Sequence, residues 1–178
     1  MDLEERLIRR KVVYQGKYIR AEEQVVRLPD GTEATREIIA PPDAVGVLPI
    51  DQTGRVYLVR QYRPAICRVT LEIPAGILEP GETSSETASR ECEEEIGMKP
   101  ERLDFLFSYY HSVGFSTGKI EVFLGRDLRP SIEAHTDPGE FIEVVTLPFE
   151  EIYRQGLTGE LVDSKTLLAL LWYRQTLH

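Results

Sequence analysis

Three glutamates in one short stretch are placed for metal chemistry. Glu91, Glu94 and Glu95 stand at positions i, i+3 and i+4. On a helix, these spacings bring the three carboxylates to one face within about one turn. Like charges that close repel one another, so a chain keeps them together when a cation lies among them. The stretch therefore predicts a Mg²⁺ site, with Mn²⁺ as an alternative ion.

The positions around these glutamates follow a longer pattern, G-x5-E-x7-R-E-U-x-E-E-x-G-U, where U is an apolar residue. An acidic helix face in solvent is the alternative explanation for a run of glutamates. It accounts for the glutamates of the helix itself, but not for the glycines, the earlier glutamate or the arginine at their offsets. The segment resembles the Nudix box. Its fixed letters are filled by Gly76, Glu82, Arg90, Glu91, Glu94, Glu95 and Gly97.

Physical reasons support most of these positions. A helix face that presents Glu91 and Glu95 one turn apart can hold one or two ions against the preceding loop. Gly76 permits the tight turn that brings this loop close to the helix. The guanidinium of Arg90 can pair with the carboxylate of Glu82 and so fix the loop to the helix. We therefore expect Gly76, Glu82 and Arg90 to act as structural support.

The resemblance also implies roles that spacing does not reveal. In the Nudix family, the carbonyl before the box glycine is a metal ligand, which here is that of Ala75. A late carboxylate from a separate loop serves as a further ligand or as the general base, which implies Glu140, with a solvated loop glutamate as the alternative. Asp137 and Glu143 could replace Glu140 in this role. The expected metal ligands are Ala75, Glu91, Glu94, Glu95 and Glu140, and the expected catalytic bases are Glu140 and Glu94.

Residues outside the box resemble the ADP-ribose pyrophosphatase and nucleoside-diphosphate-sugar hydrolase branch. The matching stretches are residues 36–39 before 44–49, 59–64 before 71–76, 139–144 and 163–166. This likeness implies that Arg63 and Arg36 contact the phosphates or the nucleoside of a substrate, and ordinary surface arginines are the alternative. Two positions depart from the branch, because Val113 stands where it usually has Pro and Gly118 where it often has Glu. His111, a lone histidine beside two tyrosines, is expected to be packed or hydrogen-bonded and not catalytic.

The expected reaction is Mg²⁺-dependent hydrolysis of the pyrophosphate bond of a nucleoside-diphosphate sugar. ADP-ribose is the first candidate, and the products are a nucleoside monophosphate and a sugar phosphate. One alternative is a nucleotide-binding sensor with this fold and no turnover. Another is a housecleaning hydrolase of nucleoside triphosphates or dinucleoside polyphosphates, because specificity depends on the site and not on the fold.

Composition limits the partners and the compartment. The 178 residues carry a formal net charge of −9, which argues against a general nucleic-acid or anionic-membrane surface. No apolar run approaches the roughly 18 residues of a membrane span. Two cysteines form no disulfide framework and suit a reducing cytoplasm. We therefore expect a cytoplasmic enzyme with a small-molecule substrate, and the resemblance implies a homodimer.

Alternating and helical patterns predict an α+β fold. We expect a hairpin around Pro29-Asp30-Gly31, a second hairpin around residues 51–54, and strands over 69–73, 103–110, 120–124 and 141–147. Helices are expected from the N-cap Thr83 to Gly97, from Pro148 to Gly156, and from the N-cap Asp163 through Leu167, Leu168, Leu171 and Trp172. The resemblance implies a Nudix-type α/β/α sandwich with a central mixed sheet, formed by residues 44–178 of a single domain. Residues 1–43 are the expected N-terminal antiparallel β hairpin region, used in dimerisation.

Overall fold

A computed structural model of the chain describes residues 2–131 and 141–177. The chain forms two compact units. The first contains Met1–Asp43 and Tyr109–Lys119, and the second contains Ala44–Ser108 and Ile120–His178. The metal-site candidates of the box all belong to the second unit.

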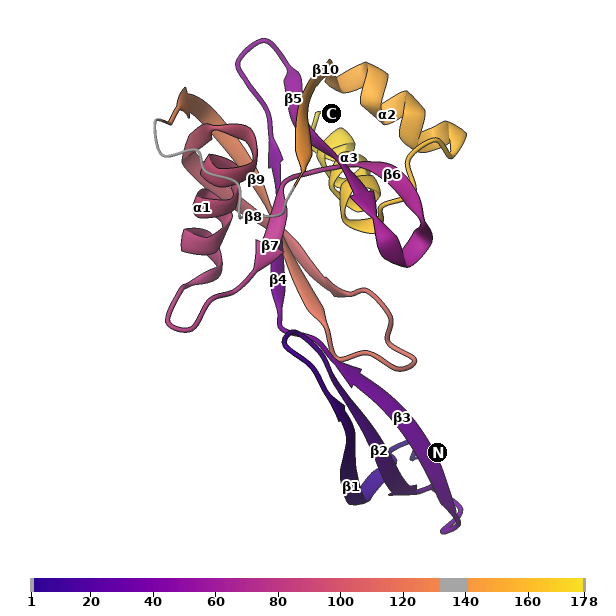
Figure 1. The fold of residues 1–178 in the computed structure, drawn as a ribbon. Helices are drawn as coiled ribbons and strands as arrows, with labels where there is room; N and C mark the ends of the chain where they lie inside the picture. Colours follow the sequence, from indigo (N-terminus) through magenta and orange to yellow (C-terminus); the bar gives the residue numbers. More distant parts are fainter. Residues whose placement is uncertain (1, 132–140, 178) are drawn as a thin grey trace. The chain divides into compact units, whose positions relative to one another are not determined.

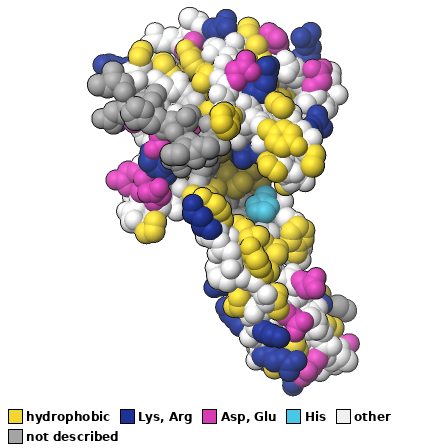
Figure 2. Space-filling model, viewed as in Figure 1, with side chains coloured by type: hydrophobic (Ala, Val, Ile, Leu, Met, Phe, Trp, Pro, Cys, Tyr) yellow, Lys and Arg dark blue, Asp and Glu magenta, His cyan; other side chains and the backbone are white. Residues whose placement is uncertain are grey.

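The first unit is built on a three-stranded antiparallel sheet. Strand β2 (Arg20–Arg27) lies between β1 (Arg6–Gln15) and β3 (Glu33–Ala40). The predicted turn between β2 and β3 is confirmed, with Gly31 at φ +87°. All of β1 is exposed to solvent, and in Figure 2 the surface of this sheet carries both apolar and basic side chains. The antiparallel β region expected within residues 1–43 thus has three strands, of which β1 is exposed along its whole length.

The second unit contains two sheets (Figure 1). The mixed sheet has the order β7 (Ala75–Ile77), β4 (Ala44–Pro49), β9 (Lys119–Pro130) and β8 (Met98–Tyr110), with β4 parallel to β9 and antiparallel to β7. The antiparallel sheet has the order β10 (Ile142–Pro148), β5 (Arg55–Arg63) and β6 (Arg68–Glu72). A short 3-10 turn at Pro64–Ile66 connects β5 to β6. The predicted mixed sheet is therefore confirmed.

The second hairpin of the sequence prediction is wrong. Its turn forms, because the N–H of Gly54 donates to the carbonyl of Asp51 at 3.0 Å. The flanking strands β4 and β5 then enter different sheets, and a single bridge between Ile50 and Val56 is the pairing recorded for this pair of segments. A turn motif specifies only the local reversal of the chain. Which strands then pair is decided by the burial of each flanking strand in its own sheet.

Three helices cover the sheets of this unit. Helix α1 (Ser84–Ile96) lies on one side, and α2 (Phe149–Thr158) and α3 (Ser164–Thr176) lie on the other (Figure 1). The predicted N-cap of α1 is confirmed as a capping box between Thr83 and Glu86, and the α3 cap at Asp163 is confirmed as well. Helix α2 does not end at Gly156 but continues to Thr158, and its C-cap is Gly159, which has φ +80°.

The core explains how α1 is held. Its apolar side, Ala88, Cys92 and Ile96, is buried as predicted and packs with valines of β4 and β5. Glu91 and Glu95 are buried as well, beside this apolar side. Helix α3 is different, because Leu168, Leu171 and Trp172 are partly exposed and its buried residues are Lys165, Thr166, Ala169 and Leu170. Within residues 2–131 and 141–177, no helix is long and apolar enough to cross a bilayer.

Candidate active site

The carboxylates of α1 lie at different depths. Glu91 and Glu95, one turn apart, are buried, with exposed fractions of 8% and 9%. The side chain of Glu94 is one-third exposed. Burying two carboxylates one turn apart is costly unless cations or hydrogen-bond donors compensate them. The helix therefore presents a concentrated negative charge to the loop that precedes it.

That loop approaches the helix very closely at Gly76. A Cβ added to this residue would lie 1.9 Å from Oε1 of Glu91, so that either the loop or the carboxylate would have to shift. Next to it, the N–H of Ala75 donates to Oε2 of Glu95 at 3.0 Å. Strand β7 holds the loop there by pairing Gly76 with Val45 of β4. The backbone of residues 75 and 76 and two carboxylates thus meet in one small volume.

Arg90 links the loop to three carboxylates. Its Nε and Nη2 donate to the two oxygens of Glu82 at 3.0 and 3.1 Å. Its Nη1 donates to Glu91 at 2.7 Å and to Glu94 at 2.9 Å, and its Nη2 also donates to the carbonyl of Ile77 at 3.3 Å. A planar guanidinium suits this forked pattern, which a lysine could not reproduce.

Electrostatics follow from this network. The hydrogen bonds from Arg90 lower the pKa of Glu82 to about 2, and those to Glu82 raise the pKa of Arg90. The pair is therefore ionised throughout the physiological range. Arg90 and Glu82 thus join the loop to the helix, and the supporting role of Gly76, Glu82 and Arg90 stays a prediction.

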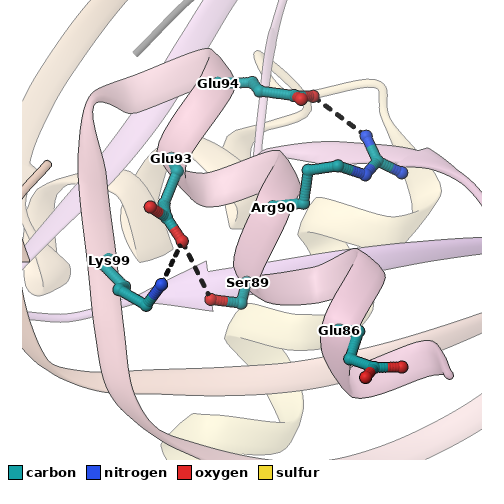
Figure 3. A pocket seen from close by; sticks show the side chains of 6 residues that line it. All are labelled: Glu86, Ser89, Arg90, Glu93, Glu94 and Lys99. Carbon is teal, nitrogen blue, oxygen red and sulfur yellow. Dashed lines mark hydrogen bonds and ion pairs between the residues drawn. The ribbon is translucent and has the colours of Figure 1, made fainter. Parts of the chain in front are cut away.

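A pocket on the outer side of α1 is lined by Glu93 and Glu94, whose side chains have different partners (Figure 3). Glu94 turns toward Arg90 at the edge of the candidate site. Glu93 turns the other way, where Lys99 lies at 2.9 Å and Ser89 at 3.3 Å from its carboxylate. Glu93 therefore pairs with Lys99 and does not belong to the carboxylate group of the site.

The residues present fit a divalent cation by their chemistry. Hard cations prefer carboxylate and carbonyl oxygens, and buried glutamates against a glycine loop supply both. In the described part of the chain, no group of three or more acidic, His or Cys side chains is already arranged around one point, since Arg90 pairs with Glu91 and Glu94. Binding an ion among these carboxylates thus requires them to share their contacts with Arg90. Glu140 and Asp137 lie outside the described residues.

Arg63 at the end of β5 is held by a buried carboxylate. Its Nε and Nη2 donate to the two oxygens of Glu72, both at 2.7 Å. Glu72 is almost wholly buried, whereas the side chain of Arg63 is 43% exposed. One edge of the guanidinium, Nε and Nη2, is therefore held by Glu72, and the rest of the Arg63 side chain is open to solvent.

Other candidates lie elsewhere. Arg36 belongs to β3 in the first unit, where its Nη2 donates to Glu5 at 2.6 Å. Glu143 of β10 is exposed and pairs with Arg60 at 3.0 Å. The structure thus brings Ala75, Glu91, Glu94 and Glu95 together with their supporting residues and gives Glu143 a surface partner.

The loop that departs from the expected pattern is closely packed within the first unit. A Cβ on Gly118 would lie 2.4 Å from Nε2 of His111 and 2.7 Å from Cγ of Pro41. His111 also lies 3.3 Å from the hydroxyl of Ser116, which agrees with a hydrogen-bonded histidine. Val113 is 85% exposed. A glutamate at position 118 would need this loop to adopt another conformation.

Two contacts were not visible in the sequence. Glu72 bonds Lys165, and the N–H of Ile73 donates to the hydroxyl of Thr166 at 2.8 Å. Both partners lie 93 residues apart. All four residues occur in stretches that resemble the ADP-ribose pyrophosphatase branch. The sequence alone, however, does not show which strand the start of a helix will contact. A lysine in the first turn of a helix, where the helix dipole disfavours a cation, was the available signal.

Glu72 should make stability depend on pH. Burial alone would raise its pKa, but hydrogen bonds from Arg63 and the charge of Lys165 lower that pKa from 4.5 to about 2. Because the pKa is lower in the folded state, this stabilisation is complete above about pH 4.5 and is lost as pH falls toward about 2. It amounts to at most about 3 kcal/mol, reduced because Arg63 is partly in solvent.

The measurement is the unfolding free energy of the wild type and Glu72→Gln between pH 7 and pH 3. We expect the wild type to be the more stable at pH 7, and the difference to shrink below about pH 4.5. A difference that stays constant over this range would contradict the assignment.

Sequence comparison gives the family. The NUDIX domain matches residues 40–170, and the nucleoside diphosphate sugar hydrolase N-terminal domain matches residues 5–39. The chain belongs to the Nudix family and is a Nudix hydrolase. Enzymes of this family generally use a divalent metal ion.

Relatives extend over nearly the whole chain. It is 37% identical to the ADP-ribose pyrophosphatase of Bacillus subtilis over 94% of this chain and 91% of the other. It is 31% identical to the ADP-sugar pyrophosphatase of Mus musculus, over 80% and 72% of the two chains. A crystal structure of an ADP compounds hydrolase superposes with a TM-score of 0.88 at 22% identity and covers 99% of this chain and 96% of that one. The last comparison confirms the predicted fold.

Proposed function

We propose that this enzyme hydrolyses the pyrophosphate bond of a nucleoside-diphosphate sugar with Mg²⁺ as cofactor, and that ADP-ribose is its preferred substrate. The observation that carries the proposal is the close approach of Gly76 to the buried pair Glu91 and Glu95. The relatives named for ADP-ribose and ADP-sugar hydrolysis, which match most of the chain, support the substrate class.

The metal ligands proposed are the carbonyl of Ala75 and the carboxylates of Glu91, Glu94 and Glu95, with Glu140 as a further ligand or as the general base. A bound Mg²⁺ would neutralise the diphosphate and lower the pKa of a bound water. Arg90 and Glu82 hold the loop against the helix, so that the ligand oxygens keep their positions. Arg63 supplies positive charge for the diphosphate or contacts to the nucleoside. The same role for Arg36 is proposed from the resemblance alone.

The general base is assigned to Glu140, with Glu94 as the alternative. Glu94 already forms an ion pair with Arg90 at 2.9 Å, which favours a supporting role for it. The pH dependence of kcat for Glu140→Gln and Glu94→Gln separates the two. Removal of the base should abolish the acidic limb of the profile, whereas removal of a ligand should lower the rate at every pH. An unchanged acidic limb in Glu140→Gln would exclude Glu140.

The choice of sugar and base is tested with a panel of substrates. The purified protein is incubated with Mg²⁺ and ADP-ribose, ADP-glucose, GDP-mannose, UDP-glucose, NADH or nucleoside triphosphates, and the products are separated by chromatography. We expect the highest kcat/KM for ADP-ribose, with AMP and ribose 5-phosphate as products. Higher activity on a triphosphate would favour a housecleaning hydrolase, and binding without cleavage of any compound would indicate a sensor.

The cytoplasmic location and the homodimer are also proposed. The β1–β3 sheet, with Leu7, Val12 and Val13 exposed on β1, is the surface we assign to the dimer. Analytical ultracentrifugation should give twice the mass of one chain, and a monomer at micromolar concentration would contradict this assignment.

A further inference from the structure

Four charged side chains gather beside the outer end of β5. Arg63 from β5, Glu72 from β6, and Asp163 and Lys165 from the start of α3 line a pocket of about 360 Å³. Two are cations and two are anions. Lys165 and Glu72 are among the most buried charged residues of the described chain, and buried charges are retained only where they are paired.

Glu72 accepts four hydrogen bonds. Its Oε1 accepts from Nε of Arg63 at 2.7 Å and from the hydroxyl of Thr70 at 2.6 Å. Its Oε2 accepts from Nη2 of Arg63 at 2.7 Å and from Nζ of Lys165. With two donors on each oxygen, the plane of the carboxylate is fixed. A fixed carboxylate plane in turn fixes the plane of the guanidinium that pairs with it through two bonds.

Lys165 and Arg63 share one oxygen of Glu72, since Nζ of Lys165 and Nη2 of Arg63 both donate to Oε2. The side chain of Lys165 is 8% exposed, and its Nζ lies 3.0 Å from Oδ1 of Asp163 in addition to its contact with Glu72. The next residue, Thr166, binds the N–H of Ile73 at 2.8 Å. The first turn of α3 is therefore attached to the end of β6, three residues before Gly76.

We propose that Lys165 is a positioning residue that acts through Glu72 to orient Arg63 for binding the substrate diphosphate. This inference rests on the proposed function, in which Arg63 contacts the diphosphate. Lys165 itself does not touch the substrate.

The charge balance gives the physical reason. Without Lys165, the buried Glu72 would have Arg63 as its one cationic partner, and Asp163 would add a second negative charge close by. An arriving diphosphate would then meet an arginine already neutralised, with an uncompensated carboxylate behind it. With Lys165 present, the charge of Glu72 is shared between two cations, so Arg63 retains attraction for an anion. Lys165 also prevents Glu72 from rotating away from the fork.

The test measures both binding and turnover. Lys165→Met removes the charge and keeps most of the stem. We expect the dissociation constant of α,β-methylene-ADP-ribose, measured by calorimetry with Mg²⁺, to rise about 10- to 100-fold. The KM of the substrate that the wild type hydrolyses best should rise by a similar factor, whereas kcat should stay within about threefold, because ground-state and transition-state binding are lost equally.

A double-mutant cycle shows whether Lys165 acts through Glu72. If it does, Lys165→Met combined with Glu72→Gln should bind the analogue no more weakly than the weaker-binding single variant. Leu170→Val serves as the structural control, because it loosens the packing of the same helix without touching the charged cluster. It should lower the melting temperature and leave the dissociation constant unchanged.

Three results would overturn the inference. They are an unchanged dissociation constant in Lys165→Met, effects of the two substitutions that simply add, and a loss of binding in Leu170→Val equal to that in Lys165→Met. Failure of the proposed function would look different, because the wild type itself would then neither bind the analogue nor cleave any diphosphate of the panel.

Discussion

Glu95→Gln should lower kcat by about 10²- to 10⁴-fold while the protein stays folded. Glu95 is buried on the box face of α1, and its Oε2 accepts the N–H of Ala75 at 3.0 Å. The amide oxygen of Gln can still accept that bond, so the loop keeps its place. What is lost is the negative charge that a divalent cation requires. The measurement is kcat on ADP-ribose at saturating Mg²⁺, together with the melting temperature.

The matched control is Glu93→Gln on the same helix. Glu93 carries the same charge but pairs with Lys99 and Ser131 on the other side of α1. We expect its kcat to stay within about twofold of the wild type, because the partners of Glu93 are Lys99 and Ser131 and not the box loop. Near-normal turnover of Glu95→Gln, or an equal loss in both variants, would remove the basis for the metal site.

Gly76→Ala should lower kcat by about 10²-fold or more. The new Cβ would lie 1.9 Å from Oε1 and 2.1 Å from Cδ of Glu91, whereas real Cβ atoms keep at least 3.0 Å. Either the loop or the carboxylate must therefore move by about 1 Å. A displacement of that size at a catalytic group is enough for a loss of this order. The measurement is again kcat, with the metal dependence of the melting temperature as a second readout.

Gly81→Ala, in the same loop, separates this contact from a general effect of adding a methyl group. Nothing lies within 4 Å of a Cβ at position 81, although its φ of +94° makes alanine strained. We expect a destabilisation of about 1 kcal/mol and a kcat within about twofold of the wild type. If Gly76→Ala behaved in the same way, the close contact with Glu91 would have no part in catalysis.

The box was predictable because its signals are local. The helix start at Thr83, its end at Gly97 and the buried side with Cys92 all follow from spacing within some twenty residues, and the structure confirms each of them. The close approach of Gly76 to the helix follows from a glycine at a fixed offset. The roles of the box residues in metal binding stay predictions, which the two variants above test.

The remaining features depend on contacts distant in sequence. The turn at residues 51–54 is visible locally, but burial separates its two strands into different sheets. The leucines of α3 predicted the helix but not its buried face, which includes Lys165 because Glu72 and Asp163 lie there to pair with it. The periodicity of apolar residues along the helix cannot show a side-chain partner that lies 93 residues away in the sequence. Glu140 rests on resemblance alone.

The most direct test of the account is hydrolysis of ADP-ribose in ¹⁸O-labelled water with Mg²⁺, with the products weighed by mass spectrometry. We predict AMP and ribose 5-phosphate in equal amounts, with one ¹⁸O atom on one of the two, and a rate that falls by at least about 10²-fold in Glu95→Gln. An intact substrate, products without the label, or an unchanged rate in that variant would contradict it.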